Sequence, residues 1–264
     1  MKIDDMGGRS IVQEVFKLAD KENTFIRYTS SNNSIENIFW TPNISRSLAS
    51  TFHTVFMLDC TYKTNRYKLP LLHIVGVTST DISFSAGFAL LSSEKEEQYI
   101  WALRMFREAL SKDNRPSCII TDRDLALMNA LSIVFPDTKL LLCRWHIHND
   151  VKAYVRKHVE DKKLWKPLLD KWRWITYSED ESDVDRLLVE VNELSVIVYE
   201  YMKKTWIEKF KEMFVEAWVK KVLHLGNTST SRVEGVHGVL KKWLETASGD
   251  LVTNWKAVES LIDT

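Results

Sequence analysis

The chain has 264 residues, 45% of them hydrophobic, enough for one large domain with its own core or for a core that carries an inserted subdomain. Lys plus Arg and Asp plus Glu both number 36, so net charge gives no sign of a polyanionic partner. Three cysteines in apolar settings are too few for a disulfide framework and predict a reducing compartment. No apolar stretch approaches the roughly 20 residues of a membrane span, and the N-terminus lacks the apolar region of a signal peptide. We therefore expect an intracellular protein with no membrane partner and no disulfide partner.

Residues 1–53 predict a helix and a hairpin that lead into the core. Apolar positions at helical spacing indicate a helix over 9–21, and 24–40 is typical of a short hairpin around a polar turn. Thr41 is expected to cap a short helix that begins at Pro42.

Residues 54–146 predict the core. Three strands come close together, and the turn between the second and third suits an antiparallel hairpin. Helices then alternate with two further strands, which implies parallel crossovers. The order βββαβαβ predicts an α/β fold with a mixed sheet covered by helices. The expected elements are strands at 54–59, 69–78 and 82–91, a helix ending near 112, a strand at 117–121, a helix at 124–134 and a strand at 138–142.

Beyond Cys143 the strand pattern disappears for some 80 residues, and 147–227 predicts an all-helical insertion before the last core helix. That helix is expected over about 231–245, within a C-terminal region, 228–264, of core helix and tail. Charge within the helical region is uneven: 144–174 holds nine Lys or Arg against four Asp or Glu, whereas 179–200 holds one against eight. The basic part either follows a DNA backbone or is a solvated helix face.

Three acidic residues in different settings carry the chemical prediction. Asp59 and Asp122 each end an apolar run that predicts a buried strand, and Glu234 opens a helical pattern. Two-metal phosphoryl transfer needs carboxylates gathered so that two divalent cations about 3.5–4 Å apart hold the attacking and leaving oxygens. The ends of such strands open to solvent and are where open α/β sheets bind ligands.

Each acid also has a purely structural interpretation. Asp59 suits an Asx turn, and Asp122 suits the N-cap of the next helix, although Asp124 is the better capping candidate. Glu234 suits a capping box with Ser231, in which its carboxylate bonds the Ser231 backbone N–H.

Cys143 and His146 have a spacing seen in zinc sites, but no fourth ligand is apparent. They are either polar groups beside the acids or a support for the insertion, or else a buried cysteine with a hydrogen-bonded histidine. Trp145 between them either stacks on an unpaired base or, as one of ten tryptophans, packs in the core.

Four further residues are candidates for phosphate contacts near the acids. Each has a solvated surface position as its alternative, and the last two share nearly the same helix face as Glu234. They are Lys63, Arg66, His237 and Lys241.

Several of these segments together resemble the Mutator-like element (MULE) transposases. They resemble that family's first acidic block, its second acidic block, its Cys-x-x-His signature and the helix bearing its third acid, in that order. The segments are Asp59–Asn65, Thr121–Ala130, Cys143–His146 and Val233–Lys241, and Ile38–Thr41 also fits. The likeness covers roughly residues 38–150 and 228–245.

The resemblance implies a ribonuclease-H-like core with an Asp-Asp-Glu triad, Asp59, Asp122 and Glu234, that binds two Mg²⁺ or Mn²⁺ ions. It implies a nuclear DNA transposase that cuts a strand at the element's end with water and transfers the freed 3′-hydroxyl to target DNA. Its partners would be transposon ends and target DNA, with a homo-oligomer assembled on DNA. Two alternatives remain: a domesticated, inactive regulator, as the likeness to transposase-derived plant factors of the far-red response allows, and a ribonuclease H or exonuclease, which the block order fits less well. The sequence shows no zinc-binding module on either side of the core, so we expect little sequence-specific DNA recognition by this chain.

Overall fold

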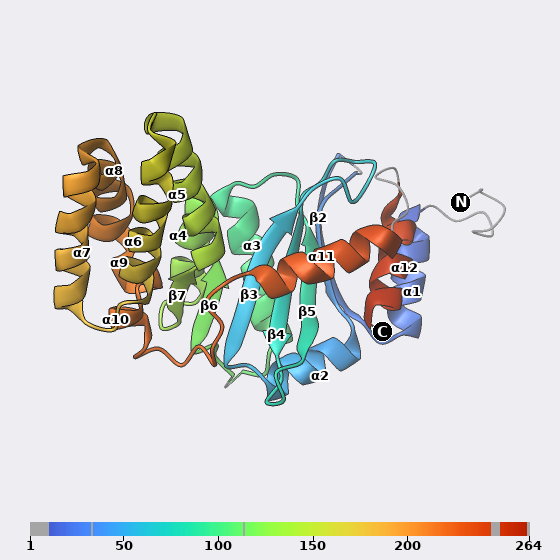
Figure 1. The fold of residues 1–264 in the computed structure, drawn as a ribbon. Coiled ribbons are helices and arrows are strands. Elements are labelled where there is room, and N and C mark those ends of the chain that lie inside the picture. Colours follow the sequence, from blue (N-terminus) through green and yellow to red (C-terminus); the bar gives the residue numbers. More distant parts are fainter. Residues whose placement is uncertain (1–10, 33, 113, 244–248, 263–264) are drawn as a thin grey trace.

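A single mixed sheet lies at the centre of the computed structural model, which describes residues 11–32, 34–112, 114–243 and 249–262 (Figure 1). Its seven strands are ordered β1-β2-β5-β4-β3-β6-β7. From β1 to β3 in this order, neighbours are antiparallel, whereas β3, β6 and β7 are parallel. The strands are β1 Phe25–Ser31, β2 Ser34–Thr41, β3 Val55–Thr61, β4 Leu71–Val77, β5 Ser83–Leu90, β6 Cys118–Thr121 and β7 Lys139–Leu142.

The expected order of three strands, helix, strand, helix and strand is found from β3 to β7, and the predicted mixed sheet is confirmed. The hairpin predicted over 24–40 is also present. Because β2 pairs with β5, that hairpin extends the central sheet instead of standing before it.

Helices lie against both faces and both edges of the sheet (Figure 1). Figure 1 shows α11 crossing the front face, α3 behind it, α5 to α10 beside β7, and α1 with α12 at the opposite edge. The helices outside the insertion are α1 Ile11–Lys21, α2 Asn43–Thr51, α3 Glu96–Ala109, α4 Leu125–Val134, α11 Ser231–Trp243 and α12 Leu251–Ile262.

Strand β3 is buried on both faces, because alternate side chains enter two different apolar clusters. Phe56 and Leu58 pack with residues of α3 and α4, whereas Val55 and Met57 point the other way and pack with Val233 of α11. The alternation along β3 therefore assigns each of its residues to the α3 side or the α11 side of the sheet.

The helices between β7 and α11 form an apolar cluster with Met128 of α4 and Leu142 of β7, and Trp172 and Trp206 are buried in it. Helix is found over most of the stretch where the sequence predicted it. The elements are α5 Arg144–His158, a 3₁₀ turn Lys162–Leu164, α6 Trp165–Tyr177, α7 Glu181–Leu194, α8 Val196–Tyr201, a π-helical turn Met202–Ile207, α9 Glu208–Phe214 and α10 Glu216–Val219.

Two local predictions were wrong. The Thr41 hydroxyl does not cap α2, because it donates to the Ala86 carbonyl oxygen at 2.9 Å, across the sheet. The predicted C-terminal tail contains α12, whose Trp255 stacks on Trp40 of β2 with ring centroids 6.0 Å apart. The predicted end of α11 at about 245 lies outside the described residues, and within them the helix reaches Trp243.

Candidate active site

Asp59 lies on β3, and Asp122 directly follows β6, the parallel neighbour of β3. The register pairs Val55 with Cys118 and Met57 with Ile120, and continuing it by two residues brings Asp59 level with Asp122. Side chains two residues apart share a face, and neighbouring strands lie roughly 4.8 Å apart. Both carboxyl groups therefore lie on the α11 side of the sheet, at its C-terminal edge.

Cys143 extends this row onto the third parallel strand. Cys118 pairs with Lys139, so the same register places Cys143 level with Asp122, one residue past the end of β7. Its thiol is fully buried and accepts a hydrogen bond from the Thr230 backbone N–H at 3.2 Å. Since Thr230 directly precedes α11, this contact fixes the start of that helix beside the row of strand ends.

Helix α11 brings two further side chains to the acids. His237 Nδ1 lies 3.5 Å from Asp59 Oδ2, and both side chains are largely buried. Glu234, one turn earlier, lies with its Oε1 atom 3.6 Å from Nε2 of His146. The Thr230 hydroxyl donates to the same Glu234 oxygen at 3.4 Å. The structure thus brings Asp59 of β3, the residues that follow β6 and β7, His146 of α5 and two residues of α11 to one side of the sheet.

These contacts weigh against the structural interpretations of two acids. Asp124, not Asp122, caps α4, because its carboxylate accepts from the backbone N–H groups of Ala126 and Leu127 at 2.8 and 3.1 Å. The Glu234 carboxylate faces Thr230 and His146, and within the described chain no hydrogen bond joins it to the Ser231 N–H. The capping box is not formed in this structure.

The surroundings of Asp122 disfavour its charge. Burial, followed by the negative charge of Asp59, raises the pKa of Asp122 above its ordinary value, against the opposing effect of His146. Like charges brought together in a partly buried place repel, and a bound cation would relieve this. The site is therefore built at some cost to stability.

Asp122→Asn is expected to raise the melting temperature at neutral pH without divalent metal. A carboxyl with a raised folded-state pKa holds its proton more tightly in the folded chain, so it lowers stability as pH rises through the range between the unfolded and folded values. The gain should disappear below about pH 3.9, where Asp is protonated in both states. Thermal unfolding at several pH values measures it, with exposed Asp185→Asn as control. A melting temperature that falls or stays constant at neutral pH would contradict the expectation.

Cys143 and His146 form a polar pair beside the acids. The hydrogen bond with Cys143 raises the pKa of His146 to about 9, despite partial burial, and the charges of Glu234 and Asp122 add to the effect. Burial favours the neutral thiol, but hydrogen bonds from His146 and Thr230 outweigh it and lower the pKa of Cys143. His146 therefore places positive charge between two of the three acids.

The donor set suits magnesium in its chemistry, since Mg²⁺ prefers carboxylate oxygens. Among the described residues, however, no three His, Cys, Asp or Glu side chains are grouped closely enough to hold a metal ion. Glu234 is turned toward His146 and Thr230. Metal binding by the three acids would require Glu234 to exchange these partners for the ion.

The remaining candidates differ in burial. His237 is only 5% exposed, which excludes the solvated helix face as its setting. Trp145 is 51% exposed, so its packing in the core was a wrong prediction, and its ring lies edge-on to His146 with centroids 4.9 Å apart. Lys63, Arg66 and Lys241 are exposed, as surface or phosphate-contacting residues must be.

Sequence reasoning missed His73. It lies on β4 directly opposite Asp59, is fully buried, and its ring centroid is 5.3 Å from that of His237. Burial, and secondarily His237, lowers the pKa of His73 well below its ordinary value, so the ring is neutral. Its Nε2 atom lies 3.0 Å from the Ser85 hydroxyl. The signal was a single polar residue inside the apolar run Leu71–Val77.

Comparison with known proteins places this site in a family context. Residues 55–150, which carry Asp59, Asp122 and the Cys143–His146 pair, match the MULE transposase domain. The resemblance to the MULE transposases is confirmed. The match ends before α11, so it does not include Glu234.

Three curated relatives that resemble this chain come from Arabidopsis thaliana. Protein FAR-RED IMPAIRED RESPONSE 1 is 25% identical over 241 residues, which covers 90% of this chain and 29% of that protein. Protein FAR1-RELATED SEQUENCE 5 is 31% identical over 130 residues, or 49% of this chain and 16% of the relative. Protein FAR1-RELATED SEQUENCE 4 is 22% identical over 248 residues, or 91% and 33%. The chain thus spans a third or less of the length of these relatives.

Two further findings concern membrane-spanning helices and the state of the cysteines. Across the part that the structure describes, no helix is both long and apolar enough to cross a lipid bilayer. Cys60, Cys118 and Cys143 are all free thiols.

Proposed function

We propose that this chain is the catalytic domain of a DNA transposase with a ribonuclease-H-like core. The observation that carries the proposal is the level placement of Asp59 and Asp122 on adjacent parallel strands, with α11 crossing the same face and presenting Glu234. Two strands and a distant helix thus bring acidic residues to the same side of the sheet, which supports a shared chemical task for them.

Each residue has a task in this proposal. Asp59, Asp122 and Glu234 would hold two divalent ions, which when bound stabilise charge on the attacking and leaving oxygens of a phosphodiester. His237 holds the Asp59 carboxylate in place on the α11 side. His146 compensates the charge of Glu234 while no metal is bound.

The decisive experiment is nicking of supercoiled DNA by the purified chain with Mg²⁺ or Mn²⁺. Metal-dependent nicking that is absent in Asp122→Asn supports the catalytic function. Wild-type chain that binds DNA without nicking it, over a range of metal concentrations, contradicts it.

The second candidate is a domesticated regulator that keeps the fold for DNA binding or assembly. It is favoured by two curated relatives that align over 90% of the chain or more and are named for a far-red response or for likeness to that protein. The pairing of Glu234 with His146 instead of a converged metal site fits it equally well.

We expect this chain to bind duplex DNA weakly, with strong salt dependence and little sequence preference. Cationic side chains meet phosphates, whereas sequence is read by contacts to base edges, for which the sequence shows no dedicated module. Fluorescence anisotropy with two unrelated duplexes at rising salt measures both properties. Tight, salt-resistant binding to one short sequence would contradict the expectation and favour the regulator.

A further inference from the structure

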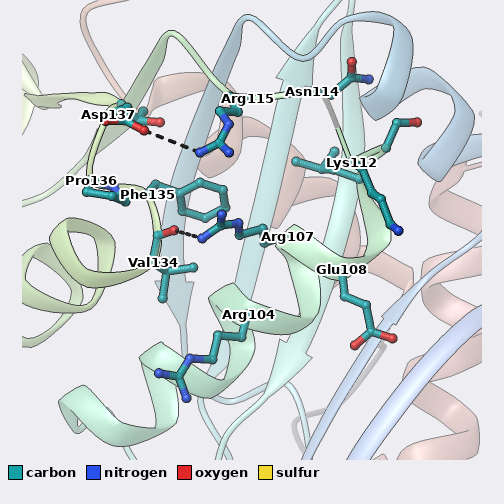
Figure 2. Close-up of a pocket in the computed structure, with 13 residues that line it drawn as sticks. Arg104, Arg107, Glu108, Lys112, Asn114, Arg115, Val134, Phe135, Pro136 and Asp137 are labelled. Atoms are coloured by element: carbon teal, nitrogen blue, oxygen red, sulfur yellow. Dashed lines mark hydrogen bonds and ion pairs between the residues drawn. The ribbon is translucent and has the colours of Figure 1, made fainter.

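A cavity of about 400 Å³ opens at the end of the sheet opposite the acids. The last turns of α3, the connection from α3 to β6, and the turn from α4 to β7 form its walls (Figure 2). β6 separates it from Asp122 by four residues, or roughly 13 Å of strand. The cavity also lies on the α3 face, whereas the acids lie on the α11 face. It is therefore distinct from the candidate active site.

The described side chains that line this cavity are mainly cationic. Four basic residues, Arg104, Arg107, Lys112 and Arg115, face two acidic ones, Glu108 and Asp137. Glu108 is neutralised from outside by Arg27, whose Nη2 atom lies 2.6 Å from its carboxylate. Among the described residues, Arg104 and Lys112 have no acidic partner. An excess of positive charge remains in a chain whose total formal charge is zero.

Two arginines line the cavity beside Phe135. Figure 2 shows Arg107, from α3, and Arg115, from the connection to β6, on either side of the Phe135 ring, each reaching toward the turn between α4 and β7. Arg107 Nη1 donates to the Val134 carbonyl oxygen at 2.9 Å, which fixes its guanidinium. Its other N–H groups have no hydrogen-bond partner among the described residues. Paired guanidinium groups fit the oxygens of a phosphate, because each offers two parallel donors.

Within the described part of the chain, the acidic partner of Arg115 is a weak one. Its Nη1 atom lies 3.4 Å from Asp137 Oδ2, and both side chains are more than half exposed, at 57% and 77%. Exposed pairs of this kind contribute about 0–1 kcal/mol. A phosphate can therefore replace Asp137 as the partner of Arg115 at little cost.

A structural explanation accounts for only part of the cluster. Cations near the C-terminus of a helix are stabilised by its dipole, and Arg107 also satisfies a carbonyl at the end of α4. Neither effect accounts for Arg115, which follows α3 by six residues and lines the same cavity as Arg107.

We propose that this cavity binds a backbone phosphate of DNA between Arg107 and Arg115, with Arg104 and Lys112 contacting the neighbouring phosphates. DNA is the chosen source of the phosphate because the proposed function acts on DNA. The contact is a second one, away from the acids. The proposal rests only on DNA binding, so it stands or falls independently of strand cleavage.

The test compares charge-removing pairs in the full chain. Arg107→Gln with Arg115→Gln removes both central cations, and Gln keeps an N–H donor for Val134. A second double variant, Lys112→Gln with Arg115→Gln, keeps Arg107 and is used if the first variant does not fold. Lys17→Gln with Lys256→Gln is the control, since it removes two exposed cations from α1 and α12. Thermal unfolding confirms folding, and anisotropy with a labelled duplex between about 50 and 200 mM salt measures affinity.

We expect each cavity pair to weaken DNA binding several-fold and to lower the slope of log affinity against log salt by about 0.9 for every phosphate that the variant no longer neutralises. The control pair should retain the wild-type slope. The proposal is overturned if the wild type does not bind DNA, if both cavity pairs bind like the wild type, or if the control weakens binding equally. The last measurement is thermal unfolding of the wild type with inorganic phosphate at constant ionic strength. If phosphate raises the melting temperature while both cavity pairs bind DNA like the wild type, the cavity binds free phosphate and DNA is the wrong ligand.

Discussion

Asp59→Asn and Asp122→Asn are each expected to reduce metal-dependent strand cleavage about a thousandfold, with the fold unchanged. Asn keeps the volume of Asp but removes the charge that holds a divalent ion. Metal stabilisation of the reacting oxygens contributes several kcal/mol, and a loss of ~4 kcal/mol lowers a rate roughly 1000-fold. Initial rates of supercoiled DNA nicking measure the loss, and circular dichroism checks the fold.

Asp124→Asn is the matched control for this pair. Asp124 lies two residues from Asp122, but its carboxylate caps α4, a task that Asn performs equally well. Its nicking rate should stay close to that of the wild type. If the wild type nicks DNA and Asp59→Asn or Asp122→Asn retains more than a small fraction of the rate, the role given to that acid is wrong.

Trp172→Ala is expected to lower the free energy of unfolding by about 3–5 kcal/mol, the usual cost of truncating a buried aromatic residue. Trp172 is fully buried among the helices between β7 and α11, and its ring centroid lies 5.8 Å from that of Phe214. Its indole N–H has no hydrogen-bond partner among the described residues. Trp172→Phe therefore sacrifices volume but no hydrogen bond and should cost less.

Trp174→Ala in the same helix provides the comparison. Trp174 is 56% exposed, so its removal should change stability by only about 0.5 kcal/mol. Urea-induced unfolding of the three variants and the wild type gives the differences. Equal effects at positions 172 and 174 would mean that this helix does not pack with Trp172 facing inward.

The sequence predicted the two acidic residues at the strands better than it predicted the residues packed around them. Asp59 and Asp122 could be found because each interrupts an apolar run, and a carboxyl group at such a place needs a reason. The face on which they lie could not be predicted, because Val55 to Leu58 are buried on both sides and show no alternation. Only the packing of α11 against one face distinguishes the two.

The other features that the sequence did not predict also depend on tertiary contacts. His73 has no local pattern that marks it, since its importance comes from Asp59 on the next strand and His237 on a distant helix. Composition favoured core packing for Trp145, yet it lies in the first turn of α5 on the side that faces solvent. The hairpin over 24–40 was found from its turn, but its place in the sheet depends on β5, some 50 residues later.

The helical block between β7 and α11 leaves and re-enters the core at one point. The Arg144 N–H donates to the Thr228 carbonyl oxygen at 3.0 Å, although 83 residues separate them along the chain. A closed excursion of this kind transmits little strain to its host, and the entropic cost of closing it grows only slowly with its length. During evolution, this helical block can therefore change in length or be replaced without moving Asp59, Asp122 or Glu234.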